Sequence, residues 1–432
     1  ASDEEAALLG SVVAGSPVHV SYDSLESAPI VLLVCLEPED ESPIIFLRLR
    51  KAARGRTQVV QVGAVATRGL DKMGGRLIAA RPGDEAAALA DLDAETAGLL
   101  AQPGAVILVG ERVAGSAGAA SAVLALAQRT GAALAWVPRR AGERGALDAG
   151  ALAGLLPGGR PLTDPTARSQ VAAAWGLDAS ALPSSPGMAG TALLEAAAAG
   201  SLAALLIGGV ELSDYPDAAL AVAAVEKTGF VVSLENHHSA VTERADVVLP
   251  VAVVTEKSGT FLDWEGRPRP FGQVLRDALT MGDARVLAMI AEAMGASVPG
   301  DVPSLRRELG ALGPWTGART PAPSAAAGAG AAGVRLATWR QLIDSGVMQE
   351  GEPHLAATAR PTVAVLSATT ANAFGESVTV SGPAGSVTLP VVVGDILDDV
   401  VWLPLNSPGC HVYADLGARE GDEVRLSAGG AA

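Results

Sequence analysis

Short apolar runs of strand length alternate with helical stretches over the first 250 residues. Residues 30–34 and 59–62 are strand-like, and residues 44–51 and 84–100 are helical in character. Further strands are expected at residues 105–109, 132–137, 202–207, 230–234 and 246–250, and Ala-rich helices at residues 116–129 and 217–227. A strand that helices cover on both faces is apolar throughout, so this alternation predicts parallel, doubly wound sheets. We expect an α/β fold with two Rossmann-like subdomains, over residues 1–104 and 105–312.

The character of the chain changes near residue 313. Residues 313–333 are rich in Pro, Ala and Gly and lack hydrophobic periodicity, which indicates a linker. Beyond it the apolar runs are short and extended, at residues 363–366, 377–380, 387–393, 400–403 and 424–426. Gly-Pro, Gly-Asp and Ser-Pro-Gly turns separate several of them. This pattern is typical of a small β-barrel or β-sandwich, and residues 334–432 are predicted to form a barrel-like end domain.

The charge balance excludes one class of partner. The chain carries 31 Lys and Arg against 47 Asp and Glu, a net charge of −16. Proteins that bind a nucleic-acid backbone need clustered cations and a basic balance, so no nucleic-acid partner is expected. No uninterrupted apolar stretch of about 18 residues predicts a membrane-spanning helix. Residues 1–30 lack the features of a signal peptide and the chain opens on Ala1, which suggests an interior fragment of a longer protein.

Candidate metal and nucleophilic sites are few. Cys35 and Cys410 are the only cysteines, too few for a disulfide framework or for an iron–sulfur cluster. Cys410-His411 has no second Cys/His cluster to complete a zinc shell, and neighbours such as His237 and His238 point to opposite faces of an extended segment. No Gly-x-Ser-x-Gly motif is present, and Cys35 follows an apolar strand, where a thiol is usually inert. We therefore expect no catalytic residue and no metal site in this chain.

Two glycine-containing loops follow predicted strands. Residues 110–116, Gly-Glu-Arg-Val-Ala-Gly-Ser, precede a helix and have half of a phosphate-binding pattern, but the expected lysine is replaced by Ser116. A plain turn between strand and helix is the other interpretation. Gly208 and Gly209 lie where open α/β sheets bind ligands, beyond a strand end. A small-molecule site at this second position is a hypothesis with no convergent polar group to support it.

A run of cations lies at the end of the first predicted helix. Arg48, Arg50, Lys51, Arg54 and Arg56 lie within nine residues. Cations near the C-terminus of a helix interact favourably with its dipole, which is one explanation for the run. The other is an interface, because a basic patch on an acidic chain can dock on an acidic neighbouring subunit.

Several segments together resemble the molybdopterin oxidoreductase superfamily, and within it the G-subunit family of bacterial NADH-quinone oxidoreductase, respiratory complex I. The resemblance covers nearly the whole chain. The segments that carry it are residues 31–43, 81–85, 245–250, 256–267, 402–409 and 416–425. Residues 256–267, Glu-Lys-Ser-Gly-Thr-Phe-Leu-Asp-Trp-Glu-Gly-Arg, are the most specific of them. The resemblance implies the two α/β subdomains and the C-terminal β-barrel of that superfamily.

The chain differs from cofactor-binding members of the superfamily at four contact segments. Residues 35–38, Cys-Leu-Glu-Pro, stand where those members have Gly-Ser-Asn-Pro, and residues 42–43, Ser-Pro, where they have His-Pro. Residues 63–65, Gly-Ala-Val, replace an Asp-Pro-Arg that contacts a ribose. Added acids appear at Asp84-Glu85 and at Asp263, and a carboxylate about 4 Å from a phosphate costs roughly 1 kcal/mol even in bulk water. The resemblance therefore implies a filled or empty cofactor cleft, with no cofactor-binding residue in this chain.

The resemblance also implies a function. The chain would be a non-catalytic scaffold portion of the peripheral-arm G subunit, supporting electron transfer from NADH to quinone through iron–sulfur clusters held in an N-terminal part that this chain lacks. Its partners would be the other hydrophilic-arm subunits, which would hold it, without direct membrane insertion, at the cytoplasmic face of the inner membrane. The alternative is a molybdopterin-binding oxidoreductase fragment of formate-dehydrogenase type, suggested by the preserved residues 259–261 and 265–267.

Overall fold

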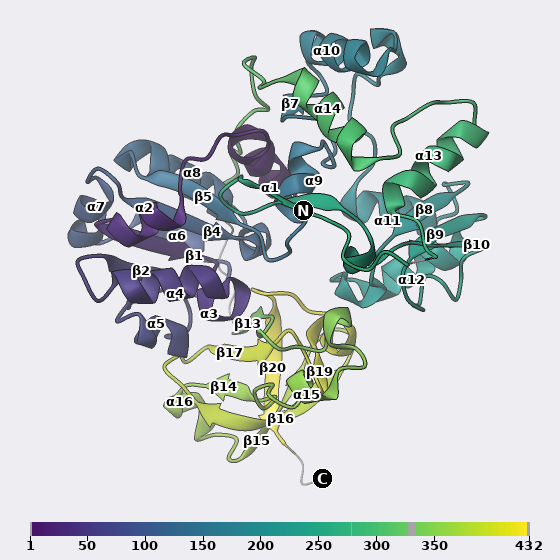
Figure 1. Cartoon of the computed structure of the whole chain (residues 1–432). Coiled ribbons are helices and arrows are strands. Elements are labelled where there is room, and N and C mark those ends of the chain that lie inside the picture. Colours follow the sequence, from purple (N-terminus) through teal and green to yellow (C-terminus); the bar gives the residue numbers. More distant parts are fainter. Residues whose placement is uncertain (1, 278, 327, 329–332, 430–432) are drawn as a thin grey trace. The chain divides into compact units, whose positions relative to one another are not determined.

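The computed structural model describes residues 2–277, 279–326, 328 and 333–429 (Figure 1). The chain forms two compact units. Unit 1 comprises Ala1–Leu8, Val18–Arg139 and Ala322–Ala432, and unit 2 comprises Leu9–Pro17 and Arg140–Pro321. Each unit is therefore built from segments that are distant in the sequence.

A parallel sheet forms the first half of unit 1. Its strands are β1 (Ile30–Val34), β2 (Gln58–Gly63), β3 (Arg76–Ala79), β4 (Val106–Gly110) and β5 (Ala133–Val137), in the order β3-β2-β1-β4-β5. All five residues of β1 and of β4 are buried, as expected for central strands of a doubly wound sheet. The predicted boundary between residues 104 and 105 runs through this sheet and is wrong. Apolar runs indicate strands but not which strands pair, so they do not assign β4 and β5 to the first sheet.

Short helices precede and connect these strands. They are α1 (Asp3–Leu8), α2 (Tyr22–Ser27), α3 (Pro38–Glu41), α4 (Pro43–Ala52), α5 (Arg68–Lys72), α6 (Glu85–Ala90), α7 (Ala94–Leu100) and α8 (Ala119–Thr130). The helix expected at residues 44–51 is confirmed as α4. The single helix expected at residues 84–100 is two helices, because Asp93 caps a new one by accepting the Thr96 backbone N–H at 2.8 Å.

The second half of unit 1 is a closed barrel. Its strands are β13 (Val334–Trp339), β14 (Ala364–Leu366), β15 (Ser377–Ser381), β16 (Ser386–Val393), β17 (Val400–Pro404) and β20 (Glu423–Ala428), in the order β13-β17-β14-β16-β15-β20. A short antiparallel pair, β18 (Asn406–Ser407) and β19 (Cys410–His411), lies between β17 and β20 in the sequence. The predicted end domain is a barrel, although the apolar runs do not predict β13. Residues 327 and 329–332 of the predicted linker lie outside the described residues.

The barrel packs on the carboxyl end of β2. Val65 and Ile396 form an isolated antiparallel bridge, and the Leu397 N–H donates to the Ala64 carbonyl at 3.2 Å. A buried apolar cluster joins the two halves of the unit: Ala64, Val65, Ala337, Trp339, Ile396, Val400 and Trp402. The barrel thus packs on the side of the sheet where the strands have their carboxyl ends, which is where open α/β folds bind ligands.

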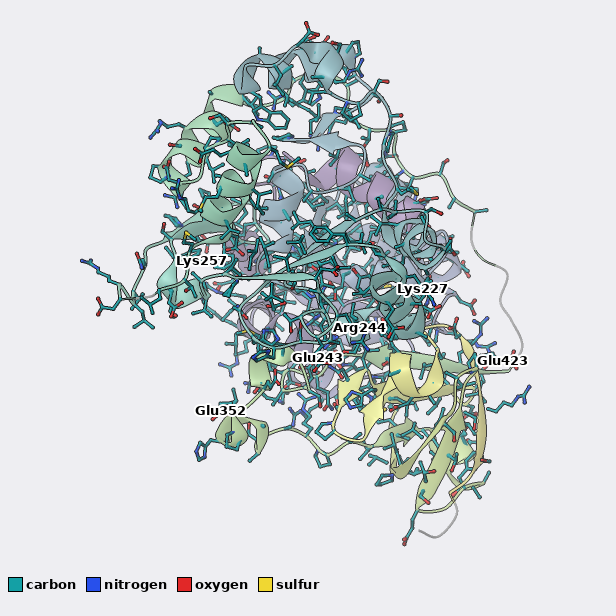
Figure 2. All side chains as sticks on the ribbon, turned by 90° about the vertical axis from the view of Figure 1, so that its right-hand side faces the viewer. Lys227, Glu243, Arg244, Lys257, Glu352 and Glu423 are labelled. Atoms are coloured by element: carbon teal, nitrogen blue, oxygen red, sulfur yellow. The ribbon has the colours of Figure 1, made fainter. Side chains whose placement is uncertain are left out.

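Unit 2 contains a smaller parallel sheet. Among its described residues the strands are β8 (Leu205–Gly208), β9 (Val231–Glu235) and β10 (Val247–Pro250), in the order β10-β9-β8. Helices α11 (Gly190–Ala198), α12 (Ala218–Lys227) and α13 (Asp283–Ala293) belong to the same unit. Lys257, labelled in Figure 2, forms an ion pair with Asp283 at the start of α13. Within the described residues, no helix is long and apolar enough to cross a membrane.

Candidate functional site

The candidate site is the region between the ends of β1 and β4, called the crevice below, where the strand order of the unit 1 sheet reverses. Open α/β sheets bind ligands at such a switch point. The chain leaves β1 through Cys35, which has a φ of 50° and is the only non-glycine residue with positive φ among those described. A backbone conformation with positive φ favours glycine, which is the residue that the resemblance implies at this position of cofactor-binding members. Gly110 ends β4 so close to this turn that an added Cβ would lie 2.2 Å from the Cys35 carbonyl oxygen.

Arg112 is the central cation of this crevice. It lies just after β4, and its Nε and Nη2 donate to the two oxygens of Glu41 at 3.1 and 3.2 Å. Its Nη1 donates to Glu420 Oε1 of the barrel at 2.8 Å. The guanidinium carbon is 5.3 Å from the centre of the Trp339 ring, also in the barrel. Arg112 therefore pairs with Glu41 within the sheet half of unit 1 and connects that half to the barrel through Glu420 and a cation–π contact with Trp339.

Asp40 makes a second connection between the same two halves. Its Oδ2 accepts from Trp339 Nε1 at 3.0 Å and from Arg360 Nη1 at 3.1 Å. Asp40 lies in α3, next to Glu41. The short helix α3 that follows the switch point thus supplies two adjacent carboxylates, of which Asp40 binds Trp339 and Arg360 and Glu41 binds Arg112.

The carboxyl groups outnumber the cations in the centre of the crevice. Burial raises the pKa of Glu420 to about 7 and raises the pKa of Glu85 above its usual value. Burial also raises the pKa of Glu37 to about 7, although its Oε2 accepts the Thr67 hydroxyl at 2.5 Å. The pKa of a carboxyl group is raised when burial removes more stabilisation of the charged form than nearby hydrogen bonds and cations provide. The crevice therefore contains more carboxyl groups than Arg112 alone can pair with.

The anion-binding position at the start of α8 is occupied by a side chain of the same unit. Glu4 Oε2 accepts from the Gly118 N–H at 2.8 Å, and its Oε1 accepts from the N–H and the hydroxyl of Ser121, both at 2.7 Å. A helix N-terminus offers such donors to phosphate groups. Here a carboxylate binds them.

A further carboxylate binds the loop that has half of a phosphate-binding pattern. Glu85 Oε2 accepts from the Ser116 hydroxyl at 2.5 Å and from the Gly83 N–H at 2.8 Å. Glu111–Gly115 form one short 3₁₀ turn between β4 and the loop before α8. The geometry favours the plain-turn interpretation, and the side chains at this crevice do not fit an anionic dinucleotide cofactor.

We expect Glu4→Ala to lower the free energy of unfolding by about 1 kcal/mol, because it removes a carboxylate that accepts three hydrogen bonds at the start of α8. Urea denaturation monitored by circular dichroism measures this change. Asp3→Ala, at the exposed neighbouring position in α1, is the matched control. Equal stability of the two variants would show that Glu4 does not cap α8.

In unit 2, the predicted ligand position at Gly208 and Gly209 lies at the end of β8. Gly209 has a φ of 60°, and its N–H donates to the Leu234 carbonyl at 3.1 Å. The nearby His237 Nδ1 lies 2.8 Å from Asn236 Oδ1 and 3.3 Å from Glu235 Oε1. These groups satisfy one another within the loop after β9. They do not form the convergent polar site that a small-molecule ligand needs.

The most family-specific segment forms a hairpin. Strands β11 (Gly259–Leu262) and β12 (Pro268–Phe271) pair antiparallel, and Phe261 stacks on Phe271 with ring centres 5.0 Å apart. Asp263, the replacement for an asparagine, accepts from the Arg267 N–H and from Arg269 Nε, both at 2.9 Å. The substituted residue therefore stabilises the hairpin turn.

The two cysteines are buried and unpaired. Burial raises the pKa of the Cys410 thiol to about 12, and its Sγ lies 3.4 Å from the Pro404 carbonyl. His411 Nδ1 lies 2.6 Å from Asn406 Oδ1. Among the described residues, no group of three or more His, Cys, Asp or Glu is arranged to hold a metal ion. A buried protonated thiol is a poor nucleophile, so Cys410 and Cys35 are unsuited to covalent catalysis.

The sequence identifies Glu37 and Glu85 as substituted positions but does not single out Arg112, Glu41, Glu420 or Glu4. Arg112 lies within the glycine-containing loop at residues 110–116. Its partner Glu420 is 308 residues further along the chain, so no local pattern can join them.

Comparisons with known proteins agree with this architecture. The family model described as "Molybdopterin oxidoreductase" matches residues 5–293. The chain is also similar in fold to acetylene hydratase from Pelobacter acetylenicus, with a TM-score of 0.52 at 14% identity, over 93% of this chain and 73% of that chain. The predicted α/β class with parallel sheets and a C-terminal barrel is thereby confirmed.

Curated relatives match over nearly the whole chain. The G subunit of NADH-quinone oxidoreductase from Mycobacterium tuberculosis is 54% identical over 99% of this chain and 55% of the relative. The protein of the same name from Streptomyces coelicolor is 48% identical over 95% of this chain and 52% of the relative. The chain thus spans about half the length of these relatives.

Proposed function

This chain belongs to the molybdopterin oxidoreductase family, and from that premise we propose that it is a non-catalytic scaffold portion of the G subunit of an NADH-quinone oxidoreductase. In this role it supports electron transfer from NADH to quinone, coupled to proton translocation, while iron–sulfur clusters elsewhere in the subunit carry the electrons. Similarity to such G subunits over nearly the whole chain supports this assignment.

The non-catalytic part of the proposal rests on the occupied crevice. The switch point holds the chain's own Arg112, Glu41 and Glu420, and Glu4 binds the donors at the start of α8. A pyrophosphate placed there would meet carboxylates rather than free N–H donors. The same ion pairs join the barrel to the sheet, so the former ligand site has become a structural joint of unit 1.

The partners and the location follow from the same proposal. The chain binds other hydrophilic-arm subunits and is held at the cytoplasmic face of the membrane through them. No residue of this chain is then required to contact NADH, quinone or a metal.

A scaffold and a catalytic subunit respond differently to damage at the crevice. We expect Arg112→Met, in the full-length protein of the native host, to reduce the amount of assembled complex several-fold while the NADH:quinone turnover per assembled complex stays within a factor of two. Native gel electrophoresis measures the assembled complex, and activity divided by that amount gives the turnover. Normal assembly with lost turnover would contradict the scaffold role.

The alternative function, a molybdopterin-dependent oxidoreductase of formate-dehydrogenase type, requires a crevice that binds phosphate groups. The hairpin segment that suggests it is preserved, but its glycine faces an aromatic ring: a Cβ on Gly259 would lie 2.5 Å from the Phe271 ring. This contact explains the glycine without a ligand.

A further inference from the structure

Helix α4 has an exposed face on which apolar and basic side chains are segregated. Ile45, Phe46 and Leu49 are buried against unit 1. On the opposite side, Ile44 and Leu47 are 52% and 53% exposed, although most large apolar residues of this sheet half are in its core. Positions 44, 47 and 51 are spaced by one turn of helix, so they share one face. The face is apolar in its first half and basic in its second.

The charge of this surface is unlike that of the rest of the chain. Residues 43–57 contain five cations and no acidic residue in a chain of net charge −16. Arg48 and Lys51 both pair with Glu26 at 2.5 Å. Within the described residues, Arg50, Arg54 and Arg56 are exposed and form no ion pair. Among the described residues, Glu26 is the one carboxylate that forms ion pairs with these five cations.

The helix dipole accounts for only part of this pattern. Arg50 and Lys51 lie in the last turn of α4, where cations are favourable. Arg54 and Arg56 lie beyond the end of the helix at Ala52, and the dipole gives no reason for exposed Ile44 and Leu47 in its first turns. Two exposed apolar side chains beside unpaired cations are instead the composition of a docking surface: an apolar centre with a charged rim.

The groups that face α4 from neighbouring elements leave this surface positive. Glu26 and Asp23 come from α2, and Glu39 of α3 pairs with Arg68 and Lys72 of α5. Lys72 Nζ also lies 5.8 Å from the centre of the Phe46 ring. Glu26 and Glu39 are thus already bound to cations of this unit, and the three exposed arginines after Leu49 are left for a partner.

We propose that the exposed face of α4 together with the loop to Arg56 is a docking surface for an acidic segment of a different polypeptide, one that places an apolar side chain between Ile44 and Leu47 and carboxylates beside Arg50 and Arg54. Charge complementarity selects this occupant. A second copy of this chain is disfavoured by the mutual repulsion of two strongly acidic molecules. The inference rests on the proposed scaffold role, because a scaffold requires neighbouring subunits.

The test places the photocrosslinking residue p-benzoylphenylalanine at Leu47 in the full-length protein, expressed from its own locus in the native host. After irradiation, mass spectrometry identifies the crosslinked peptide. We expect an adduct with another polypeptide at a segment containing Asp or Glu within a few residues of the crosslink. The same probe at Gln128, an exposed position of α8, is the control site and should give no such adduct.

Charge reversal tests the rim. Arg50→Glu with Arg54→Glu should reduce the Leu47 adduct at least tenfold, while Arg129→Glu, an exposed cation on α8, should leave it unchanged. An adduct with phospholipid, with a second copy of the chain or with a segment lacking acidic residues, or no adduct, would overturn the docking proposal. Purification of the chain with the respiratory complex is scored separately. An adduct with an acidic partner outside that complex would contradict the scaffold role but support the docking surface. Co-purification with the complex but without an adduct would support the scaffold role and contradict the docking surface.

Discussion

Arg112→Met is expected to lower the free energy of unfolding by about 3–5 kcal/mol at pH 7.5, the usual cost of breaking a buried ion pair by removing one partner. The Arg112 side chain is 15% exposed, and those of Glu41 and Glu420 are 4% and 18% exposed. Without the guanidinium these two carboxylates would face each other in a poorly solvated crevice. The loss should shrink at pH 5.5, because the carboxyl groups can then be protonated.

Guanidinium chloride denaturation at the two pH values measures this prediction. Arg129→Met, which removes an exposed cation from α8, is the control and should change the stability by less than about 0.5 kcal/mol. Adding Glu41→Gln to Arg112→Met should recover part of the lost free energy of unfolding, since it removes one of the unpaired charges. A loss of the same size at both pH values, with no recovery in the double variant, would show that Arg112 contributes packing rather than charge compensation.

The second large effect is a fall in stability with rising pH. The pKa values of Glu37 and Glu420 are raised from 4.5 to about 7 in the folded chain. Between these values the folded state binds more protons than the unfolded state, so raising the pH through this window favours unfolding. Each carboxyl group contributes on the order of 3 kcal/mol, at about 1.36 kcal/mol per pKa unit. The raised pKa of Glu85 acts in the same direction.

This dependence is measured as the free energy of unfolding at intervals from pH 5 to pH 8. The pKa of Glu39 and that of Asp93 are lowered in the folded chain. The stabilisation that these two carboxylates give to the fold is therefore lost only at more acidic pH. Glu37→Gln should reduce the slope substantially, because it removes one titrating group and keeps an oxygen that can accept the Thr67 hydroxyl. Glu95→Gln, an exposed position in α7, should leave the slope unchanged. A stability that rises from pH 5 to pH 8 would contradict the raised pKa values.

Much of the fold can be predicted because its signals are local. The continuous apolar run at Ile30–Val34 and the one at Val106–Gly110 indicate strands buried on both faces. The short extended runs after residue 361 indicate the barrel in the same way. Neither pattern states which strands pair, so the first predicted domain boundary falls inside one sheet.

The elements that the sequence does not reveal have equally physical reasons. Strand β13 (Val334–Trp339) follows directly on an Ala/Gly tract, and Arg335 and Thr338 interrupt its apolar residues, so it contains no continuous apolar run. The helix predicted over residues 84–100 is interrupted by the cap at Asp93, which accepts hydrogen bonds from the backbone N–H and the hydroxyl of Thr96. Such interruptions are not visible in hydrophobic periodicity.

The sequence predicts the sign of the charge added at the candidate site but not the geometry of the site. The substitutions at Glu37 and Glu85 indicate that negative charge has entered the crevice. The ion pair and hydrogen bonds that organise it join Arg112 to Glu420 across 308 residues, and Glu4 to Ser121 across 117. Long-range pairs of this kind depend on the strand order and on how the barrel packs, which the sequence pattern does not specify.

Because the chain's own side chains occupy the crevice, the chain should bind no pterin cofactor. The most direct test is the molybdenum, tungsten and pterin content of the full-length protein, purified with its complex from cells grown with added molybdate and tungstate. A molybdopterin enzyme purified from the same cells shows that cofactor survives the procedure. We predict that Mo, W and oxidised pterin are absent from the chain at any stoichiometric level, while the control enzyme is loaded. Stoichiometric metal with pterin would contradict the occupied crevice and make this chain a cofactor-binding oxidoreductase.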